Sequence, residues 1–309
     1  KNLITISNDK KRALKSMEIT FSPTILIVTA LSKEFQAVKD LLKKPRYDPS
    51  LKAEKIQYPH YKIGNNDVVL AMAGMGNNFS SSIATKMLVH YDSIQYIIMV
   101  GIAGGIPNAD DSVKHIRLGD IVISGDKGII QHDFGKQTSE GHQYNFDPRP
   151  VCAILLRNAK VLIEEAGKNK FKYWEIFDKL IEKDEDKYKR QQQPQLNDSP
   201  WIKDSSVILP IAPNGFDDNR PRVHIGAIAS GNDVIKEAEF RNQLVKKYPE
   251  IKAIEMEASG IADASWLAGK DSFVIRGICD YCNTEKNKIW QEYAAGVAAA
   301  FAIELIETL

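Results

Sequence analysis

The sequence predicts an α/β protein, a three-layer sandwich in which helices cover both faces of a central, mixed and mostly parallel sheet. Short apolar runs rich in β-branched residues recur along the 309-residue chain, as in 24–29 (TILIVT) and 96–100 (YIIMV). Such runs are typical of strands that are buried on both faces. Most of them precede a segment whose apolar residues have helical spacing. This alternation requires crossover connections, which place helices on the two faces of the sheet.

The first part of the chain contains the most regular alternation. Residues 1–22 are polar and basic and predict a linker or N-terminal arm, so we place the globular domain at 23–309. After a strand at 24–29, Ser32 is a candidate cap for a helix with apolar positions at Phe35 and Val38. The further elements expected here are strands at about 54–63 and 67–73, a helix at 78–90, and a strand at 96–100 that enters the glycine-rich segment 101–105.

The second part contains a polar insert at about 170–222, which is charged and Gln-rich at first and then rich in Pro, Asn and Asp. This composition predicts a helical extension and a long loop, and it is too polar for an independent domain. The other elements expected here are strands at 119–124 and 128–131, a helix at 151–167, a strand at 223–229, a helix at 234–247, a strand edge at 253–257 entering a helix at 258–268, a strand at 272–278, and a helix at about 289–308.

The composition excludes several classes of partner. The net charge of +1 supplies no general field that would attract nucleic acid or an acidic membrane. No apolar run approaches the ~18–20 residues that are needed to cross a bilayer. We therefore expect a small-molecule ligand, a cytoplasmic location, and neither nucleic acid nor membrane as a partner.

The cysteines point in the same direction. Cys152, Cys279 and Cys282 are too few, and odd in number, for a disulfide scaffold, which favours a reducing compartment. Cys279 and Cys282 form a C-x-x-C pair, which would fit a redox centre or half of a zinc site. The pair ends an apolar strand instead of opening a helix, and no second pair with metal-ligand spacing accompanies it, so a chance match is the simpler interpretation. We expect no metal and no cofactor.

Several polar groups follow predicted strands, at the sheet edge where α/β proteins bind ligands. They are Glu34, the segment 101–105, Glu255, Glu257 and Asp280. Each also has a structural interpretation: a glycine-rich turn, acids at the start of a helix, or a turn residue. Taken together, several acids at neighbouring strand ends are what acid–base chemistry on a small ligand requires.

These segments resemble the purine nucleoside phosphorylase/nucleosidase superfamily, on its hydrolytic branch, which includes methylthioadenosine/S-adenosylhomocysteine nucleosidase. The resemblance runs from about Ile25 to Leu305, apart from the insert. The matching motifs are 29–34 (TALSKE), 74–76 (GMG), 100–105 (VGIAGG), 118–124 (LGDIVIS), 230–233 (SGND), 254–257 (IEME) and 275–280 (IRGICD). The last two, in that order and spacing, are highly specific. The resemblance implies a nucleoside phosphorylase-like fold.

A closer resemblance links the chain to nucleosidase modules of fungal and bacterial innate-immunity proteins, some of which release adenine from ATP and related nucleotides. It rests on 276–280 (RGICD) followed by Lys286, Lys288, Trp290 and 293–295 (YAA), and on 129–131 and 133–136. It implies a module that is fused to, or works with, other defence domains. Relatives are commonly oligomeric, so it also implies a homo-oligomer.

The resemblance assigns a role to each acid. Asp280 would be the general acid that protonates the purine at N7, because a purine anion leaves poorly. Glu34 would orient and deprotonate the attacking water, and Glu257 would bind the ribose hydroxyls and favour an oxocarbenium-like transition state. The other substrate-binding residues that it implies are Met256, Glu255, Ile102, Ala103, Gly104, Ser230, Trp290, Lys286 and Lys288.

The first loop favours hydrolysis over phosphorolysis. Phosphorylases of this superfamily place Gly and Arg there to hold phosphate, whereas this loop reads ALSKE at 30–34. A glutamate would repel phosphate and suit water activation. Lys33 is a cation in the same loop that would still suit an anion.

The 5′ substituent of the substrate is the open question. Trp290 matches an aromatic residue that borders the alkylthio pocket of methylthioadenosine nucleosidases, whereas Lys286 and Lys288 suit a polyphosphate or belong to a solvated loop. We therefore predict cleavage of ATP or other adenine nucleotides to adenine and ribose 5-phosphates, as an immune effector module. The alternatives are a methylthioadenosine/S-adenosylhomocysteine nucleosidase, a phosphate-dependent phosphorylase, and a catalytically silent nucleotide-binding module.

Overall fold

The computed structural model describes residues 21–309 except 52–56, 109, 112–113, 140, 167–172, 194–219 and 287. The predicted arm at 1–22 therefore lies almost entirely outside the described residues. Within them, a nine-stranded mixed sheet has the order β10-β9-β6-β11-β5-β1-β4-β3-β2. Its strands are β1 (Ile25–Thr29), β2 (Arg46–Tyr47), β3 (Pro59–Ile63), β4 (Asn66–Met72), β5 (Tyr96–Gly105), β6 (Ile121–Gln131), β9 (Val223–Ser230), β10 (Ile251–Glu255) and β11 (Asp271–Asp280).

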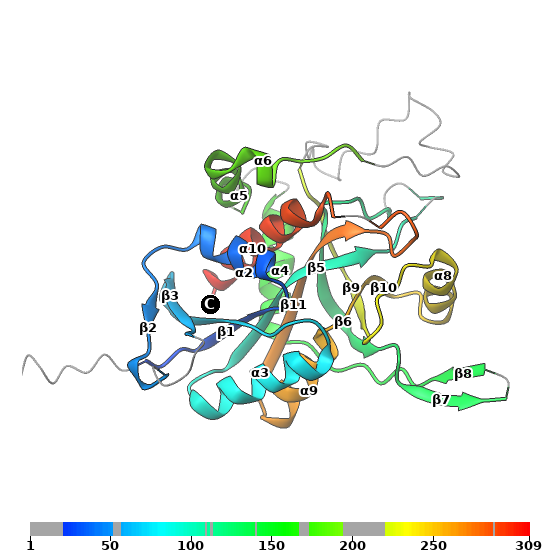
Figure 1. Cartoon of the computed structure of the whole chain (residues 1–309), viewed down its shortest axis with the longest axis horizontal. Helices are drawn as coiled ribbons and strands as arrows, with labels where there is room; N and C mark the ends of the chain where they lie inside the picture. The colour runs from blue at the N-terminus through cyan, green and yellow to red at the C-terminus, as the bar shows by residue number, and fades with distance from the viewer. Residues whose placement is uncertain are drawn as a thin grey trace, which may run out of the picture.

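The predicted mixed α/β fold is confirmed by this sheet and the helices around it (Figure 1). Its central strands are parallel, as in the pairs β1–β4, β1–β5 and β11–β5, while β3–β4 and β11–β6 are antiparallel. All five residues of β1 are buried, as expected of a strand covered on both faces. The helices are α2 (Ser32–Leu41), α3 (Asn77–His90), α4 (Ala153–Ala166), α5 (Tyr173–Lys183), α6 (Glu185–Tyr188), α8 (Ala238–Lys247), α9 (Ala258–Leu267) and α10 (Gln291–Ile306).

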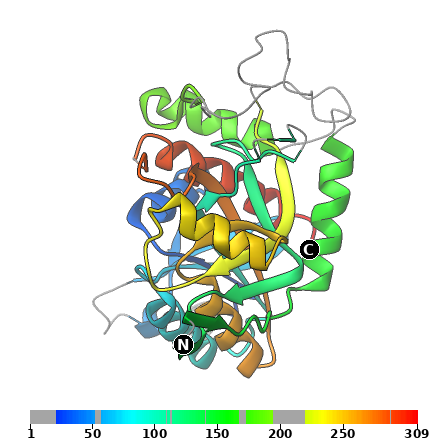
Figure 2. The same cartoon turned by 90° about the vertical axis from the view of Figure 1, so that its right-hand side faces the viewer.

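Two helical layers enclose the sheet. The Ala-rich α10 packs against β5 and β11 and contacts α2, α4 and α5, whereas α3 and α9 pack together on the opposite face. Every residue of α10 from Tyr293 to Ile306 is buried, because its small side chains let the helix approach the sheet closely. Asn158 of α4 donates a hydrogen bond to the Thr308 carbonyl, which places α4 beside the C-terminus (Figure 2).

One strand closes part of the sheet on itself. β10 pairs in parallel with β9 and antiparallel with β5, so that β10, β9, β6, β11 and β5 form a ring. In this closure Gly104 and Gly105 lie opposite Ile254 and Ala253. A Cβ on Gly105 would lie 2.6 Å from Cγ2 of Ile278 in the neighbouring strand β11, so β5 and β11 can approach each other here only where β5 has no side chain.

The structure differs from the sequence-based expectation in several elements. The glycine-rich segment 101–105 continues β5 instead of forming a turn, because it has strand partners on both sides. The two strands expected at 119–124 and 128–131 are one strand, β6, with an irregular register between Ser124 and Ile129. Helix α8 begins at Ala238, not at 234. The sequence analysis did not predict β2, the 3₁₀ turn at Pro49–Leu51, or the hairpin of β7 (Gly135–Thr138) and β8 (Gly141–Tyr144).

The described part of the polar insert contains α5 and α6, in line with the expected helical extension. Tyr173, Phe177 and Leu180 form the buried face of α5, and this face packs on α10. The long loop expected in the insert lies mostly at 194–219, outside the described residues. None of the described helices has the length and apolar character needed to cross a lipid bilayer.

Candidate active site

The predicted acids converge where β5, β10 and β11 end and α2 and α9 begin. Glu34, Glu255, Glu257 and Asp280 are all at least 95% buried, with exposed fractions of 2–5%. Buried carboxyl groups need hydrogen bonds or counter-charges. The partners of each carboxyl group therefore show what it is positioned to do.

Glu34 is held by backbone amides from two segments. Its Oε2 accepts hydrogen bonds from the N–H groups of Ala30 (2.7 Å) and Leu31 (2.8 Å), and its Oε1 accepts one from Ile102 N–H (2.8 Å). Glu34, not the predicted Ser32, therefore fixes the turn between β1 and α2. A carboxylate can accept about four hydrogen bonds, so one acceptor position remains on Oε1. Gly101 makes this approach possible, because a Cβ there would lie 2.5 Å from Oε1.

A buried arginine lies at the centre of the acids. Arg276 of β11 has no exposed surface, and its Nη2 donates to Oε2 of Glu255 and, at 3.3 Å, to Oε2 of Glu257. Its Nη1 faces the Ile102 carbonyl at 3.5 Å. The charge of Arg276 also acts on Glu34, so three carboxyl groups interact with one guanidinium. If all were ionised, the cluster would carry a net negative charge.

Glu255 and Glu257 have different local partners. Both oxygens of Glu255 accept hydrogen bonds from the first amides of α9, those of Glu257 and Ala258, at 3.0 Å. Glu255 therefore caps this helix, the structural interpretation that the sequence left open. Glu257 instead accepts one hydrogen bond at Oε1 from Gly76 N–H (3.2 Å). It is the less saturated of the two carboxyl groups.

The electrostatic environment favours the neutral form of two of these acids. Burial raises the pKa of Glu34, although Arg276 and the three backbone N–H groups oppose the shift. Burial, and then the negative charge of Glu255, raise the pKa of Glu257, against the opposing effect of Arg276. Carboxyl groups with raised pKa values are suited to proton transfer near neutral pH.

Asp280 lies at the end of β11, opposite Gly104. Its Oδ1 accepts a hydrogen bond from Cys282 N–H (2.9 Å), and Cys282 adopts the left-handed backbone conformation (φ 51°) that aims this amide at the carboxyl group. A Cβ on Gly104 would lie 2.9 Å from Oδ1. Glu34 and Asp280 therefore lie at the same short stretch of β5, beside Ile102 and Gly104.

Lys286, which was predicted to bind a polyphosphate or to belong to a solvated loop, is the described cation that contacts Asp280. Lys286 Nζ lies 3.2 Å from Asp280 Oδ2, in the loop between β11 and α10. Burial lowers the pKa of Lys286, but the charge of Asp280, the two neighbouring cysteines and the hydrogen bond to Asp280 together raise it. Lys288 is exposed, in line with a solvated loop. The structure thus gives the two lysines different environments.

The two cysteines beside Asp280 are free and buried. The Cys279 thiol donates to Asp280 Oδ2 at 3.2 Å. Burial, and then the Asp280 charge, raise the pKa of both thiols, that of Cys282 to about 12. Reactive and metal-binding cysteines need the thiolate. Among the described residues, no group of three or more His, Cys, Asp or Glu side chains is arranged to hold a metal ion.

The remaining predicted substrate-binding residues lie around this cluster. Met256, which stands between the two glutamates in the sequence, is half-buried, and so is Ile102 of β5. Ala103 and Gly104 of the same strand are buried. Ser230 lies opposite Glu255 in the β9–β10 pair, but its hydroxyl donates to Asn77 Oδ1 (2.9 Å) and thereby links β9 to α3. Lys33 contacts Glu292 of α10 at 3.4 Å. The substrate contacts of these residues stay predictions.

A cavity of about 260 Å³ adjoins Asp280 and Trp290. The insert supplies one of its walls through Gln191 and Gln192. The next residue, Gln193, is anchored by both ends of its amide to the N–H and carbonyl of Leu118 (3.1 and 2.6 Å). The end of the insert that precedes 194–219 thus lies beside the proposed acid.

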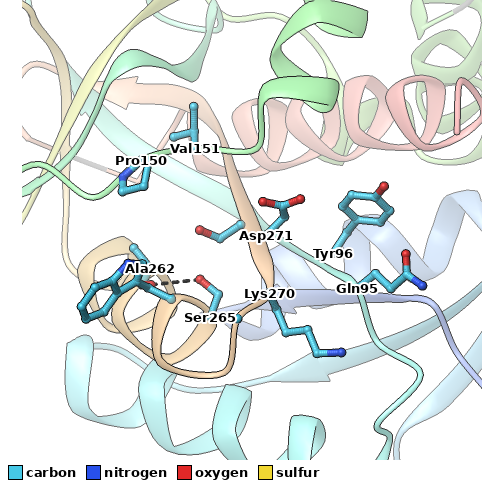
Figure 3. A pocket seen from close by; sticks show the side chains of 11 residues that line it. Gln95, Tyr96, Pro150, Val151, Ala262, Ser265, Lys270 and Asp271 are labelled. Carbon is cyan, nitrogen blue, oxygen red and sulfur yellow. Dashed lines mark hydrogen bonds between the residues drawn. The ribbon is translucent and has the colours of Figure 1, made fainter.

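A larger cavity of about 590 Å³ lies at the other edge of the sheet (Figure 3). Its lining includes Tyr96 and Asp271, the first residues of β5 and β11, together with Ser265 and Lys270. Both strands run from this cavity towards the acid cluster. The large cavity is therefore separate from the candidate active site.

Three contributions to the site were not predicted from the sequence: those of Arg276, of Gly76, and of the insert residues Gln191 and Gln192. Arg276 stands in a quoted motif but received no role, although a charged residue within an apolar strand is the signal that would have identified it. Gly76 contributes through its backbone, for which its φ of 102° is needed. The approach of Gln191 and Gln192 to Asp280 leaves no local signal in the sequence.

Comparison with known proteins places this geometry in a family. The family model described as the phosphorylase superfamily matches residues 24–307. A nucleotide-binding leucine-rich repeat (NLR)-like protein of Hyaloscypha variabilis is 33% identical over 253 residues, which cover 77% of this chain. The chain spans about a quarter of that relative, 24% of its length.

Other relatives are similar over nearly their whole length. A 5′-methylthioadenosine/S-adenosylhomocysteine nucleosidase of Maridesulfovibrio salexigens is 21% identical, with 91% of this chain and 95% of the relative covered. Nucleosidases of the same name from Neisseria meningitidis and Helicobacter pylori have solved structures that superpose with TM-scores of 0.63 and 0.65, at 18% and 17% identity. They cover 93% and 94% of this chain, and each is itself covered completely. With a family match over nearly all of its described residues, the chain belongs to the phosphorylase superfamily, as its sequence motifs predicted.

Proposed function

We propose that the chain hydrolyses the N-glycosidic bond between a purine base and its ribose. The observation that carries this proposal is the placement of two carboxyl groups on one stretch of β5: Glu34 at Ile102 N–H and Asp280 beside Gly104. In this proposal Glu34 would handle the water and Asp280 would donate a proton. The nucleosidase names of the full-length relatives support the same reaction class.

Asp280 would donate its proton to N7 of the base. As the bond from C1′ to N9 breaks, its electron pair moves into the purine, and protonation at N7 lets the base leave as a neutral molecule. The Cys282 amide fixes one oxygen of Asp280, which leaves Oδ2 for the proton transfer. Because Oδ2 also contacts Lys286, this cation must move or adjust during the reaction.

Glu34 would take the proton of the attacking water. Three amides fix its orientation, and its remaining acceptor position lies on Oε1, next to Ile102. The water oxygen forms the new bond to C1′, while Glu34 gains one proton and Asp280 loses one. Exchange with solvent then restores both groups, so no cofactor is needed to balance the reaction.

The surplus of negative charge suits the transition state. Breaking the bond to the base leaves positive charge on the ribose, as in other glycosyl hydrolyses. Glu257 has a single backbone partner, fewer than Glu34 or Glu255, and is adjacent in the sequence to Met256, where the ribose would bind. A positive sugar would compensate the charge that burial disfavours in the free site, so stabilisation would be larger in the transition state than in the ground state.

The described cations near Glu34 and Glu257 do not form a site for a phosphate nucleophile. Arg276 is occupied by Glu255 and Glu257, and Lys33 contacts Glu292. Three carboxyl groups would repel an attacking phosphate. We therefore favour water over phosphate as the nucleophile.

Within this activity, we propose adenine nucleotides as substrates and a role as an effector module. The NLR-like relative supports the second part, because such a long protein shares this segment with the chain. The alternative substrate, methylthioadenosine, is favoured by the names of the full-length relatives and by Trp290 beside the cavity at Asp280. Self-association and fusion to defence domains stay predictions.

The substrate proposal is tested by chromatography of the products from ATP, AMP, adenosine, methylthioadenosine and guanosine. We expect adenine together with the matching ribose 5-phosphate from ATP and AMP. Adenine from methylthioadenosine alone would assign the chain to the metabolic enzymes. Binding of nucleotides without release of any base would instead indicate a silent module.

Replacing Glu34 with Gln is expected to lower base release by about 10²–10⁴-fold, the usual contribution of general acid–base catalysis. The amide cannot take a proton from water, and its NH₂ group would face backbone donors, which would cost about 1–3 kcal/mol of stability. Nucleotide binding, measured by calorimetry, should persist. The control is Gln36→Ala, an exposed change on the same helix that should leave turnover unchanged. Unchanged turnover in Glu34→Gln would contradict the proposed role.

The raised pKa of Glu257 predicts opposite pH dependences for activity and stability. Between the ordinary and the raised pKa, the folded protein holds a proton that the unfolded chain has released. The free energy of unfolding should therefore fall as pH rises through this window, by up to about 1.4 kcal/mol per pH unit for one proton. Meanwhile kcat/KM should rise as Glu257 ionises. Denaturant titrations across pH would check this, and Glu257→Gln should flatten the stability curve; equal slopes in both proteins would refute the assignment.

A further inference from the structure

We propose that Lys286 is a specificity-determining residue, which holds Asp280 in an unproductive ion pair until an anionic 5′ group of the substrate draws the ammonium group away. The observation behind it is the contact between Lys286 Nζ and Asp280 Oδ2 at 3.2 Å. The inference rests on the proposed function, because it needs Asp280 to act as the acid. It goes further by explaining how one residue would favour nucleotides over nucleosides.

The partners of Asp280 divide its two oxygens between them. The Cys282 amide holds Oδ1 at 2.9 Å, and the Cys279 thiol and Lys286 both approach Oδ2. Among the described residues, Lys286 is the cation that contacts this carboxyl group. The oxygen that is not fixed by the backbone is therefore the one that the ammonium group covers.

The ion pair obstructs the oxygen that must reach the base. The ammonium group covers Oδ2, and Asp280 is only 4% exposed, so a substrate base can contact this oxygen only after Lys286 moves. A general acid must lie within hydrogen-bond reach of the atom that it protonates. Removing the ammonium group would thus free Oδ2 without any change in the backbone.

Lys286 has the freedom to exchange partners, and Asp280 does not. The Lys286 side chain is 26% exposed and lies on the loop between β11 and α10. A lysine has a flexible four-carbon stem. Asp280 is attached to the Cys282 amide and lies at the end of a central strand. A phosphate carries more negative charge than one carboxylate and offers more acceptors, so it competes for the ammonium group. A hydroxyl or alkylthio group carries no charge and does not.

The test compares AMP with adenosine, which differ only at the 5′ position. For the wild type we expect a higher kcat/KM with AMP. Lys286→Met should reduce this preference by about tenfold or more, the size of one charge-assisted interaction. Cleavage of adenosine should be unchanged or faster, because Asp280 is released, while cleavage of AMP should slow. Lys286→Arg should retain the preference.

Two comparisons separate this role from a structural one. Lys246→Met removes an exposed cation on α8 and should leave the ratio of the two substrates near the wild-type value. A merely structural lysine, or one that relays protons, would lower the kcat/KM of both substrates in equal proportion when replaced, and that result would overturn the inference. If the wild type releases no base from any purine substrate, the proposed function itself fails, independently of Lys286.

Discussion

Replacing Asp280 with Asn is expected to reduce base release by about 10²–10⁴-fold, while the protein stays folded and still binds nucleotide. Asparagine has nearly the same shape as aspartate, and its carbonyl oxygen can accept the hydrogen bond from Cys282 N–H. Its amide group cannot give a proton to N7 at neutral pH. The loss should therefore appear in kcat, because the interaction that it removes exists only as the base departs.

The matched control for this variant lies on the same strand. Asp271 begins β11 at the large cavity of Figure 3 and is exposed, so Asp271→Asn should leave turnover unchanged. Single-turnover kinetics and calorimetric binding would separate chemistry from binding. Wild-type turnover in Asp280→Asn would remove Asp280 from the acid role. Loss of binding with unchanged kcat would make it a binding residue instead.

Replacing Arg276 with Met is expected to lower the free energy of unfolding by about 3–5 kcal/mol, the cost of leaving buried charges without their partner. The guanidinium has no exposed surface and contacts Glu255 and Glu257, and its charge also acts on Glu34. Methionine fills much of the space but supplies no charge and no donor. Part of the loss should be recovered by Glu255→Gln in the same chain, because one carboxylate fewer then lacks a partner.

Urea denaturation of the purified variants would measure this effect. Arg149 provides the control: it pairs with Asp147 and Asp263, is 30% exposed, and should cost no more than about 1 kcal/mol when replaced by Met. An Arg276→Met protein as stable as the wild type would mean that the carboxyl groups are neutral in the folded state. The charge balance proposed for the transition state would then be wrong.

Sequence patterns were sufficient to predict the strands that helices cover on both faces of the sheet. Residues 24–29 form a short apolar run and residues 272–278 form another that Arg276 interrupts, and both belong to central strands in the structure. The hairpin of β7 and β8 was missed because it pairs only with itself and lacks an apolar face. The glycines of the segment 101–105 were compatible with a turn or with a backbone that approaches a ligand, and the segment continues β5 because both β10 and β11 pair with it. Side chains at Gly104 and Gly105 would collide with Cys282 and Ile278.

The site shows the same division between local and distant information. The acids could be predicted from their positions after strands, and the structure brings them together. Their partners could not be predicted, because Gly76 and Glu257 are 181 residues apart in the sequence and Ile102 and Glu34 are 68 apart. Lys286 was predicted to bind a polyphosphate or to belong to a solvated loop, and its contact with Asp280 was not predicted. A side-chain contact across a loop of this kind depends on how the loop folds, which spacing does not determine.

The phosphate dependence of base release distinguishes water from phosphate as the nucleophile. The measurement is the yield of adenine and of sugar products from AMP, first in phosphate-free buffer and then with excess inorganic phosphate. If water is the nucleophile, we expect equal adenine yields and no sugar 1-phosphate in either buffer. Adenine that appears only with phosphate, together with one equivalent of sugar 1-phosphate, would contradict it.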